Sequence, residues 1–86
     1  MTSVVVYTRP LCQPCKATKR KMDQLGIPYR EVELNDETRR YVTSLGYDQA
    51  PVITVDYGEG VTTSWSNYRP DLIQQLKETL SDTESD

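Results

Sequence analysis

The sequence predicts a single α/β domain in which a four-stranded mixed sheet carries three helices, in the order β-α-β-α-β-β-α. Three observations lead to this prediction. The chain has 86 residues, enough for one modest core. Short β-branched runs alternate with helical patterns, which is typical of βαβ units with a parallel strand pair. Finally, two strand-like stretches rich in β-branched residues, 52–55 and 61–65, flank a glycine-containing turn, and this arrangement predicts an antiparallel hairpin.

The first strand and the first helix have clear boundaries. Residues 3–8 form a short β-branched run, and we place this strand at the centre of the sheet because it is the most hydrophobic one. A helix is expected from Cys12 or Gln13 to about Leu25. Gly26 marks its end, because glycine adopts the left-handed conformation that closes many helices.

The remaining elements follow in order. Apolar residues between Ile27 and Leu34 mark a second strand, and Asn35 is a suitable N-cap for a short helix that ends at Gly46. The hairpin comes next, and Pro70 suits the first turn of a last helix. We expect one domain over residues 1–80. Residues 81–86 are polar and acidic without an apolar residue, so a disordered tail is expected there.

Composition restricts the class of protein. The net charge is −3, but residues 1–22 contain five basic and no acidic residues, whereas the rest of the chain is strongly acidic. The basic segment is either a solvated helix face or a positive field that attracts acidic partners. We expect no nucleic-acid binding, because basic and aromatic residues do not interleave. No apolar run is long enough to cross a membrane, and the N-terminus lacks the pattern of a signal peptide, which favours the cytoplasm.

Both cysteines of the chain, Cys12 and Cys15, lie in one Cys-x-x-Cys motif between the first expected strand and the first expected helix. This position is typical of a redox-active dithiol. The thiolate is the attacking species, and the unpaired N–H groups and partial positive charge of a helix N-terminus lower its pKa. The motif therefore predicts that Cys12, at the open end, is the attacking thiolate and that Cys15 is the resolving thiol.

Two other uses of the cysteine pair remain as alternatives. One Cys-x-x-Cys can be half of a four-ligand zinc site, but the chain has no His and no third Cys, so zinc would have to bridge two subunits. A structural disulfide is the other alternative, although so small a closed ring constrains the unfolded chain little. We predict redox use and expect no bound cofactor or metal.

Two further stretches narrow the prediction. With Cys-x-x-Cys at the first helix, the element order resembles the thioredoxin fold in its glutaredoxin-sized form. Residues 45–53, Leu-Gly-Tyr-Asp-Gln-Ala-Pro-Val-Ile, resemble the segment that places a cis-proline beside the cysteines in that fold. Residues 65–71, Trp-Ser-Asn-Tyr-Arg-Pro-Asp, resemble the Trp-Ser-Gly-Phe-Arg-Pro-Asp signature of the NrdH-redoxins, which are glutaredoxin-like in sequence and thioredoxin-like in activity.

The resemblance implies roles by position. Cys12 becomes the nucleophile, Cys15 the resolving thiol and Pro51 the cis residue beside them. The residues expected to support this site are Arg9, Gln13, Pro14, Ala50, Pro51, Trp65, Ser66, Tyr68, Arg69 and Asp71. Trp65 is either a core aromatic or a recognition residue, and the pair Arg69 and Asp71 could equally be a simple helix-start pair.

The sequence also departs from the NrdH-redoxin pattern. Gln13-Pro14 replaces Val-Gln or Met-Gln between the cysteines, and Pro14 removes one backbone donor from the helix start. Asn67 replaces a glycine, but asparagine tolerates a left-handed conformation better than most residues. Tyr68 replaces phenylalanine, and the hairpin over residues 56–63 is longer than in the family.

The resemblance implies a monomeric, cytoplasmic dithiol–disulfide oxidoreductase. Its expected partners are a class Ib ribonucleotide reductase, to which it supplies electrons, and a thioredoxin reductase, which restores its dithiol. The alternative is a glutaredoxin or mycoredoxin that uses a low-molecular-weight thiol. Arg9 favours this alternative, because it matches the position of a glutaredoxin lysine that contacts glutathione.

Overall fold

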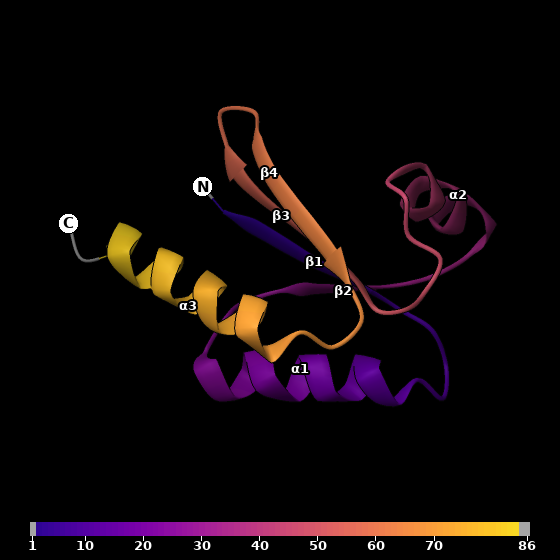
Figure 1. The fold of residues 1–86 in the computed structure, drawn as a ribbon, viewed down its shortest axis with the longest axis horizontal. Helices are drawn as coiled ribbons and strands as arrows, with labels where there is room; N and C mark the ends of the chain where they lie inside the picture. Colours follow the sequence, from indigo (N-terminus) through magenta and orange to yellow (C-terminus); the bar gives the residue numbers. More distant parts are fainter. Residues whose placement is uncertain (1, 85–86) are drawn as a thin grey trace.

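The structure is a computed structural model that describes residues 2–84, and its element order is the predicted one (Figure 1). The strands and helices are β1 (Ser3–Thr8), α1 (Gln13–Leu25), β2 (Arg30–Glu33), α2 (Asp36–Ser44), β3 (Val52–Gly58), β4 (Val61–Ser66) and α3 (Pro70–Glu84). No helix in this described range is both long and apolar enough to cross a membrane.

The four strands form one mixed sheet with the order β2-β1-β3-β4. Strand β1 pairs with β2 in parallel and with β3 antiparallel, so the predicted central position of the first strand is confirmed. Strands β3 and β4 form the predicted hairpin. Its two turn residues, Glu59 and Gly60, both have positive φ angles, of 55° and 80°. Such turns match the twist of the flanking strands, and the turn is shorter than the sequence indicated.

Helices α1 and α3 lie together on one face of the sheet, whereas α2 lies on the other side (Figure 1). Alternate residues of the strands point towards α1 and α3, because successive side chains of a strand face opposite ways. The core on this face consists of Val4, Val6, Met22, Ile27, Ile53, Val55, Trp65, Ile73 and Leu76. On the opposite face, the ring of Tyr41 in α2 packs 5.9 Å from the ring of Tyr7.

Helix α3 is longer than the sequence suggested. It continues to Glu84, so the segment 81–84, where we expected disorder, is helical. A helix adds one backbone hydrogen bond for each further residue, and this extension requires no apolar burial. The lack of apolar residues was therefore a poor indicator of where the helix ends. Residues 85 and 86, the rest of the expected tail, lie outside the described residues.

Candidate active site

Cys12 is the N-cap residue of α1. Its backbone is extended, with φ −104° and ψ 109°, and its side chain accepts a hydrogen bond at the open end of the helix. The donor is the backbone N–H of Cys15, whose nitrogen lies 3.2 Å from Sγ of Cys12. An N-cap side chain accepts from the second or third helical residue. Pro14 occupies the second position and has no N–H, so Cys15 is the donor that remains.

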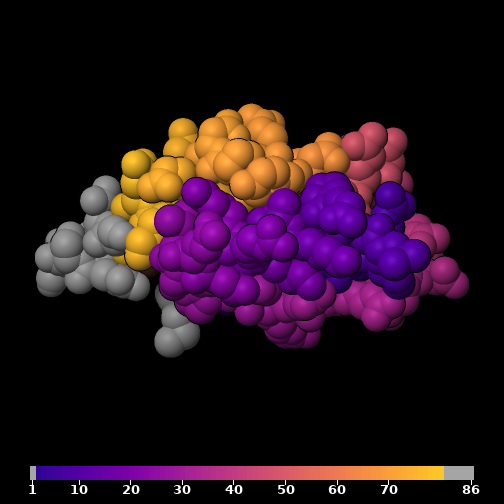
Figure 2. Space-filling model, turned by 90° about the horizontal axis from the view of Figure 1, so that it is seen from below, coloured from indigo at the N-terminus to yellow at the C-terminus, as the bar shows by residue number. Residues whose placement is uncertain are grey.

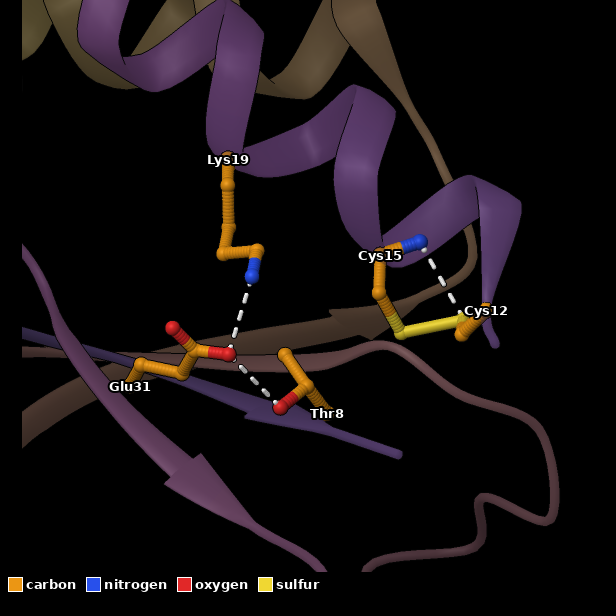
Figure 3. Close-up of a disulfide and its surroundings, with 5 residues drawn as sticks. All are labelled: Thr8, Cys12, Cys15, Lys19 and Glu31. Carbon is orange, nitrogen blue, oxygen red and sulfur yellow. Dashed lines mark hydrogen bonds and ion pairs between the residues drawn. A yellow bond between two sulfur atoms is a disulfide. The ribbon is translucent and has the colours of Figure 1, made fainter. Parts of the chain in front are cut away.

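Cys12 and Cys15 are joined by a disulfide in the structure (Figure 3). Both side chains are buried, with exposed fractions of 5 % for Cys12 and 2 % for Cys15. They form a small cluster with Ala50, against which Leu34 packs. The two sulfur atoms therefore lie in a partly apolar setting at the point where α1 begins, with the more enclosed cysteine inside the helix.

The bond between Ala50 and Pro51 is cis, as the resemblance implied. Pro51 is buried, and its carbonyl oxygen accepts a hydrogen bond from the backbone N–H of Asn67 at 2.8 Å. Asn67 has a φ of 69°, so the left-handed conformation expected for this glycine replacement is confirmed. This hydrogen bond connects the proline loop to the 65–71 segment.

The other residues of the 65–71 segment differ in their burial and in their contacts. Trp65 is only 7 % exposed and belongs to the main core between the sheet and helices α1 and α3. Arg69 and Asp71 are exposed and pair with each other: Nε and Nη2 of the arginine donate to the two carboxylate oxygens at 3.2 and 3.0 Å. This pairing holds the pKa of Asp71 below its ordinary value. Ser66 is half-buried, and Tyr68 is 38 % exposed.

A cleft of about 520 Å³ opens beside the disulfide. Its walls come from the end of β1, the loop that follows, the start of α1 and strand β2. The lining residues are Thr8, Arg9, Pro10, Leu11, Cys12, Cys15, Lys16, Lys19, Glu31 and Glu33. Of the expected supporting residues, Arg9 lines this cleft, while Gln13 and Pro14 are exposed on the first turn of α1.

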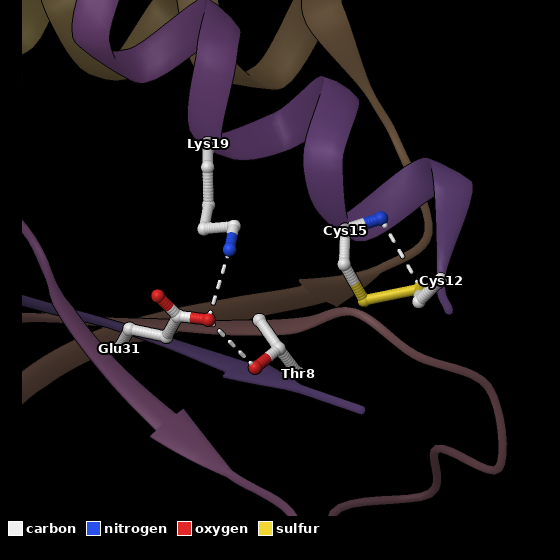
Figure 4. Close-up of polar contacts among 5 residues, drawn as sticks. All are labelled: Thr8, Cys12, Cys15, Lys19 and Glu31. Atoms are coloured by element: carbon white, nitrogen blue, oxygen red, sulfur yellow. Dashed lines mark hydrogen bonds and ion pairs between the residues drawn. A yellow bond between two sulfur atoms is a disulfide. The ribbon is translucent and has the colours of Figure 1, made fainter. Parts of the chain in front are cut away.

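A polar network of three residues crosses the cleft (Figure 4). Lys19 reaches from α1 to the carboxylate of Glu31 on β2, with 2.9 Å between Nζ and Oε2. The hydroxyl of Thr8, at the end of β1, donates to the same oxygen at 3.0 Å. These contacts lower the pKa of Glu31, chiefly through the hydrogen bond from Lys19. The network joins the active-site helix to two strands of the sheet.

The Lys19–Glu31–Thr8 network predicts a small pH dependence of stability. The pKa of Glu31 is lower in the folded chain, so the interaction stabilises the fold above the ordinary glutamate pKa of about 4.3 and is lost as the pH falls through the folded-state value. Because both side chains are partly exposed to water, we expect Glu31→Gln to cost about 0.2–1 kcal/mol at pH 7. Urea unfolding at pH 7 and pH 3 measures this difference in the free energy of unfolding, which should be smaller at pH 3 than at pH 7.

A matched control for this experiment lies on the same strand. Glu33 also lines the cleft but has no ion pair within residues 2–84. We expect Glu33→Gln to change stability by less than Glu31→Gln at pH 7. An equal loss from both substitutions would contradict the assigned network.

Seven residues that line this cleft were not among the expected site residues: Thr8, Pro10, Leu11, Lys16, Lys19, Glu31 and Glu33. A signal for Lys19 was present, because it follows Cys15 by four positions and therefore lies on the same face of α1. Glu31 is brought to the site only by the parallel pairing of β1 with β2, in which it lies opposite Val6. Within the described chain, no three His, Cys, Asp or Glu side chains are grouped to hold a metal ion.

A dithiol that opens and closes at a helix N-terminus exchanges two electrons with the thiols or the disulfide of another molecule. The fold and the site thus define a thiol–disulfide oxidoreductase. The family model of the glutaredoxins matches residues 4–59, and the chain belongs to the glutaredoxin family.

Individual relatives agree with this assignment. The glutaredoxin-like protein NrdH of Salmonella typhimurium is 34 % identical over 79 residues, which cover 90 % of this chain and 91 % of the relative. The Gene 56 protein of Mycobacterium phage D29 is 33 % identical over 78 residues, which cover 87 % and 82 %. The chain is thus similar to bacterial NrdH proteins and to a phage protein.

Solved structures show the same fold. The NrdH-redoxin of Escherichia coli superposes with a TM-score of 0.73 at 34 % identity, over 86 % of this chain and 93 % of that one. Chloroplastic thioredoxin z superposes with a TM-score of 0.66 at 19 % identity, over 100 % and 80 %. The second match shows the fold alone. Together they confirm the predicted thioredoxin fold.

Proposed function

We propose that this chain is a cytoplasmic, monomeric redoxin that supplies electrons to a class Ib ribonucleotide reductase and is itself reduced by a thioredoxin reductase. The redox partner of such a chain is either a protein or a small thiol such as glutathione, and we propose a protein. The observation that carries it is the conformation of the 65–71 segment, which lies next to the proline loop.

In glutaredoxins, this region carries a glycine-rich turn before an aspartate, and the turn and the aspartate bind the charged end of glutathione. Here both carboxylate oxygens of Asp71 already accept hydrogen bonds from Arg69. Pro70, just before Asp71, has no N–H to offer. The N–H of Asn67 is also occupied, because it donates to the carbonyl of Pro51. A glutathione molecule would therefore find few free partners at this position.

The names of two relatives support a thioredoxin-like role. The Salmonella protein carries the name NrdH, and the Escherichia coli NrdH-redoxin is described as having a thioredoxin-like activity profile. Their similarity extends over most of the present chain. A thioredoxin-like profile implies exchange with proteins rather than with glutathione.

The chemistry that we propose has two steps. The thiolate of Cys12 attacks one sulfur of the partner's disulfide, which forms a mixed disulfide and releases the other partner sulfur as a thiolate. Cys15 then loses its proton and attacks Sγ of Cys12. This closes the disulfide seen in the structure and releases the second partner thiolate. Two electrons pass to the partner, and its two thiolates take up protons.

Cys12 suits the role of nucleophile for two reasons. Its sulfur accepts the N–H of Cys15, a contact that stabilises a thiolate more than a neutral thiol. It also lies at the N-terminus of α1, where the helix dipole favours negative charge. Cys15 lies one turn further in and is the less exposed of the two, as suits a thiol that acts within the mixed disulfide.

A glutaredoxin or mycoredoxin activity is the second candidate. Arg9 favours it, because this cation lines the disulfide cleft and has no ion pair within residues 2–84. The carboxylate of a small thiol could bind there. We rank this candidate second because the 65–71 segment offers so few free groups to the rest of such a ligand.

Reduction of the oxidised chain distinguishes the two candidates. We expect thioredoxin reductase with NADPH to reduce it at least tenfold faster than glutathione with glutathione reductase and NADPH. Glutathione bound at the 65–71 segment would lack about three hydrogen bonds. Each is worth about 0.5–1.5 kcal/mol, so their loss accounts for a difference of this size. The oxidation of NADPH at 340 nm measures both rates. Efficient turnover only with glutathione would favour the second candidate.

A further inference from the structure

Leu11 combines two features that local physics disfavours. Its side chain is 94 % exposed, although leucine is a residue that proteins usually bury. Its backbone has a φ of 57°, in the left-handed region where Cβ crowds the following carbonyl. Glycine or asparagine adopts this conformation more easily. The fold itself therefore gains nothing from a leucine at this position.

The place of Leu11 suggests why it is there. It immediately precedes Cys12 and lines the disulfide cleft together with both cysteines. Figure 2 shows the surface formed by α1, with the N-terminal part of the chain at one end of it. Any molecule whose disulfide reaches Cys12 must pass close to this exposed side chain. Strained residues that the surrounding fold does not require are often functional.

The charges around Leu11 are arranged asymmetrically. Arg9 and Lys16 line the same cleft, and neither has an ion pair within residues 2–84. The acids of the cleft, Glu31 and Glu33, both lie on the β2 wall, and Lys19 pairs with the first of them. The side formed by the β1–α1 loop and α1 is therefore cationic.

We propose that Leu11 is an apolar anchor for the protein partner and that Arg9 and Lys16 pair with acidic residues beside it. The partner surface is thus an acidic polypeptide segment with an apolar contact next to its disulfide. This inference rests on the proposed function, since it assumes that the partner is a protein, and it names the chemistry that the partner presents. Leu11 and the two cations determine specificity and take no part in the exchange itself.

Three synthetic peptides with an internal disulfide test the proposal without any reductase. The first has a leucine next to one cysteine and acidic flanking residues. The second replaces that leucine with serine, and the third replaces the acids with lysines. The pre-reduced chain is mixed with each peptide, the reaction is quenched with acid, and mass spectrometry gives the second-order rate constant. We expect the first peptide to react about tenfold faster than either of the others.

Single substitutions in the chain show which residues cause the preference for the first peptide. Leu11→Asn should abolish the preference for the first peptide over the second, while the midpoint of thermal unfolding stays unchanged or rises. Val61→Ala is the matched control, because Val61 is an exposed apolar residue on the distant hairpin, and it should leave the preference intact. Lys16→Glu should reverse the order of the acidic and basic peptides, whereas Lys77→Glu on α3 should not.

The possible results distinguish the proposal that Leu11 is an anchor from the proposed function of the chain. Equal rates for the three peptides, or an unchanged preference in Leu11→Asn, would overturn the anchor and leave the choice of reductase untouched. A loss of stability in Leu11→Asn together with slower reaction of every disulfide would assign Leu11 a structural role and would also overturn it. A peptide preference in a chain that only glutathione reduces would instead overturn the proposed function.

Discussion

Cys15→Ser should trap a mixed disulfide between Cys12 and a partner. In this variant Cys12 still attacks the partner's disulfide, but the thiol that resolves the product is missing. Steady turnover should fall at least a thousandfold, because a covalent intermediate accumulates that no second step removes. Non-reducing electrophoresis followed by mass spectrometry of the adduct measures the trapped species. The adduct should be attached to Cys12.

The reciprocal substitution is the control. Cys12→Ser should also lose turnover but should trap no adduct, because Cys15 is more deeply buried and already inside the helix. An adduct on Cys15 in this variant, formed as fast as the adduct on Cys12, would exchange the roles of the two cysteines. Cys12→Ser should remain folded, because a serine can also cap the helix from position 12.

Trp65→Ala should destabilise the fold by about 3–5 kcal/mol, the usual effect of truncating a large buried aromatic. Trp65 is 7 % exposed and packs in the core shared by the sheet, α1 and α3. Domains of this kind are stable by about 5–15 kcal/mol, so the loss is a large fraction of the total. Urea unfolding followed by circular dichroism measures it.

Trp65→Phe separates packing from recognition. The indole N–H of Trp65 is buried without a hydrogen-bond partner within residues 2–84, so phenylalanine keeps most of the apolar contact and removes an unpaired donor. We expect Trp65→Phe to lower the free energy of unfolding by less than half as much as Trp65→Ala does, and to leave turnover normal. A stable Trp65→Phe variant that turns over tenfold more slowly would show that the indole contacts the partner.

Much of this protein could be predicted from its sequence because the signals are local. Glycine after Leu25 ends α1, and Asn35 caps α2 with a hydrogen bond from the N–H of Thr38. The Cys-x-x-Cys motif at the start of a helix is likewise a local signal, and it predicted where the disulfide lies. Asn67 was expected to replace a glycine in a left-handed turn, and its φ is 69°.

The end of α3 was less predictable. Composition indicated disorder from residue 81, yet the helix continues to Glu84. Where a helix ends without a glycine or proline, its last turn depends on small differences in backbone hydrogen bonding. Such differences leave no clear mark in a sequence.

The sequence alone determined the class of chemistry, because a cysteine pair at a helix N-terminus is a local arrangement. Tertiary structure decided what surrounds it. Glu31 reaches the cleft because β1 and β2 pair in parallel, and Trp65 belongs to the core because its strand places it opposite Ile53. The exposure of Leu11 likewise depends on the surfaces left uncovered once the sheet and helices have packed. Pairing and packing join residues far apart in the chain, and no local pattern records which of them will meet.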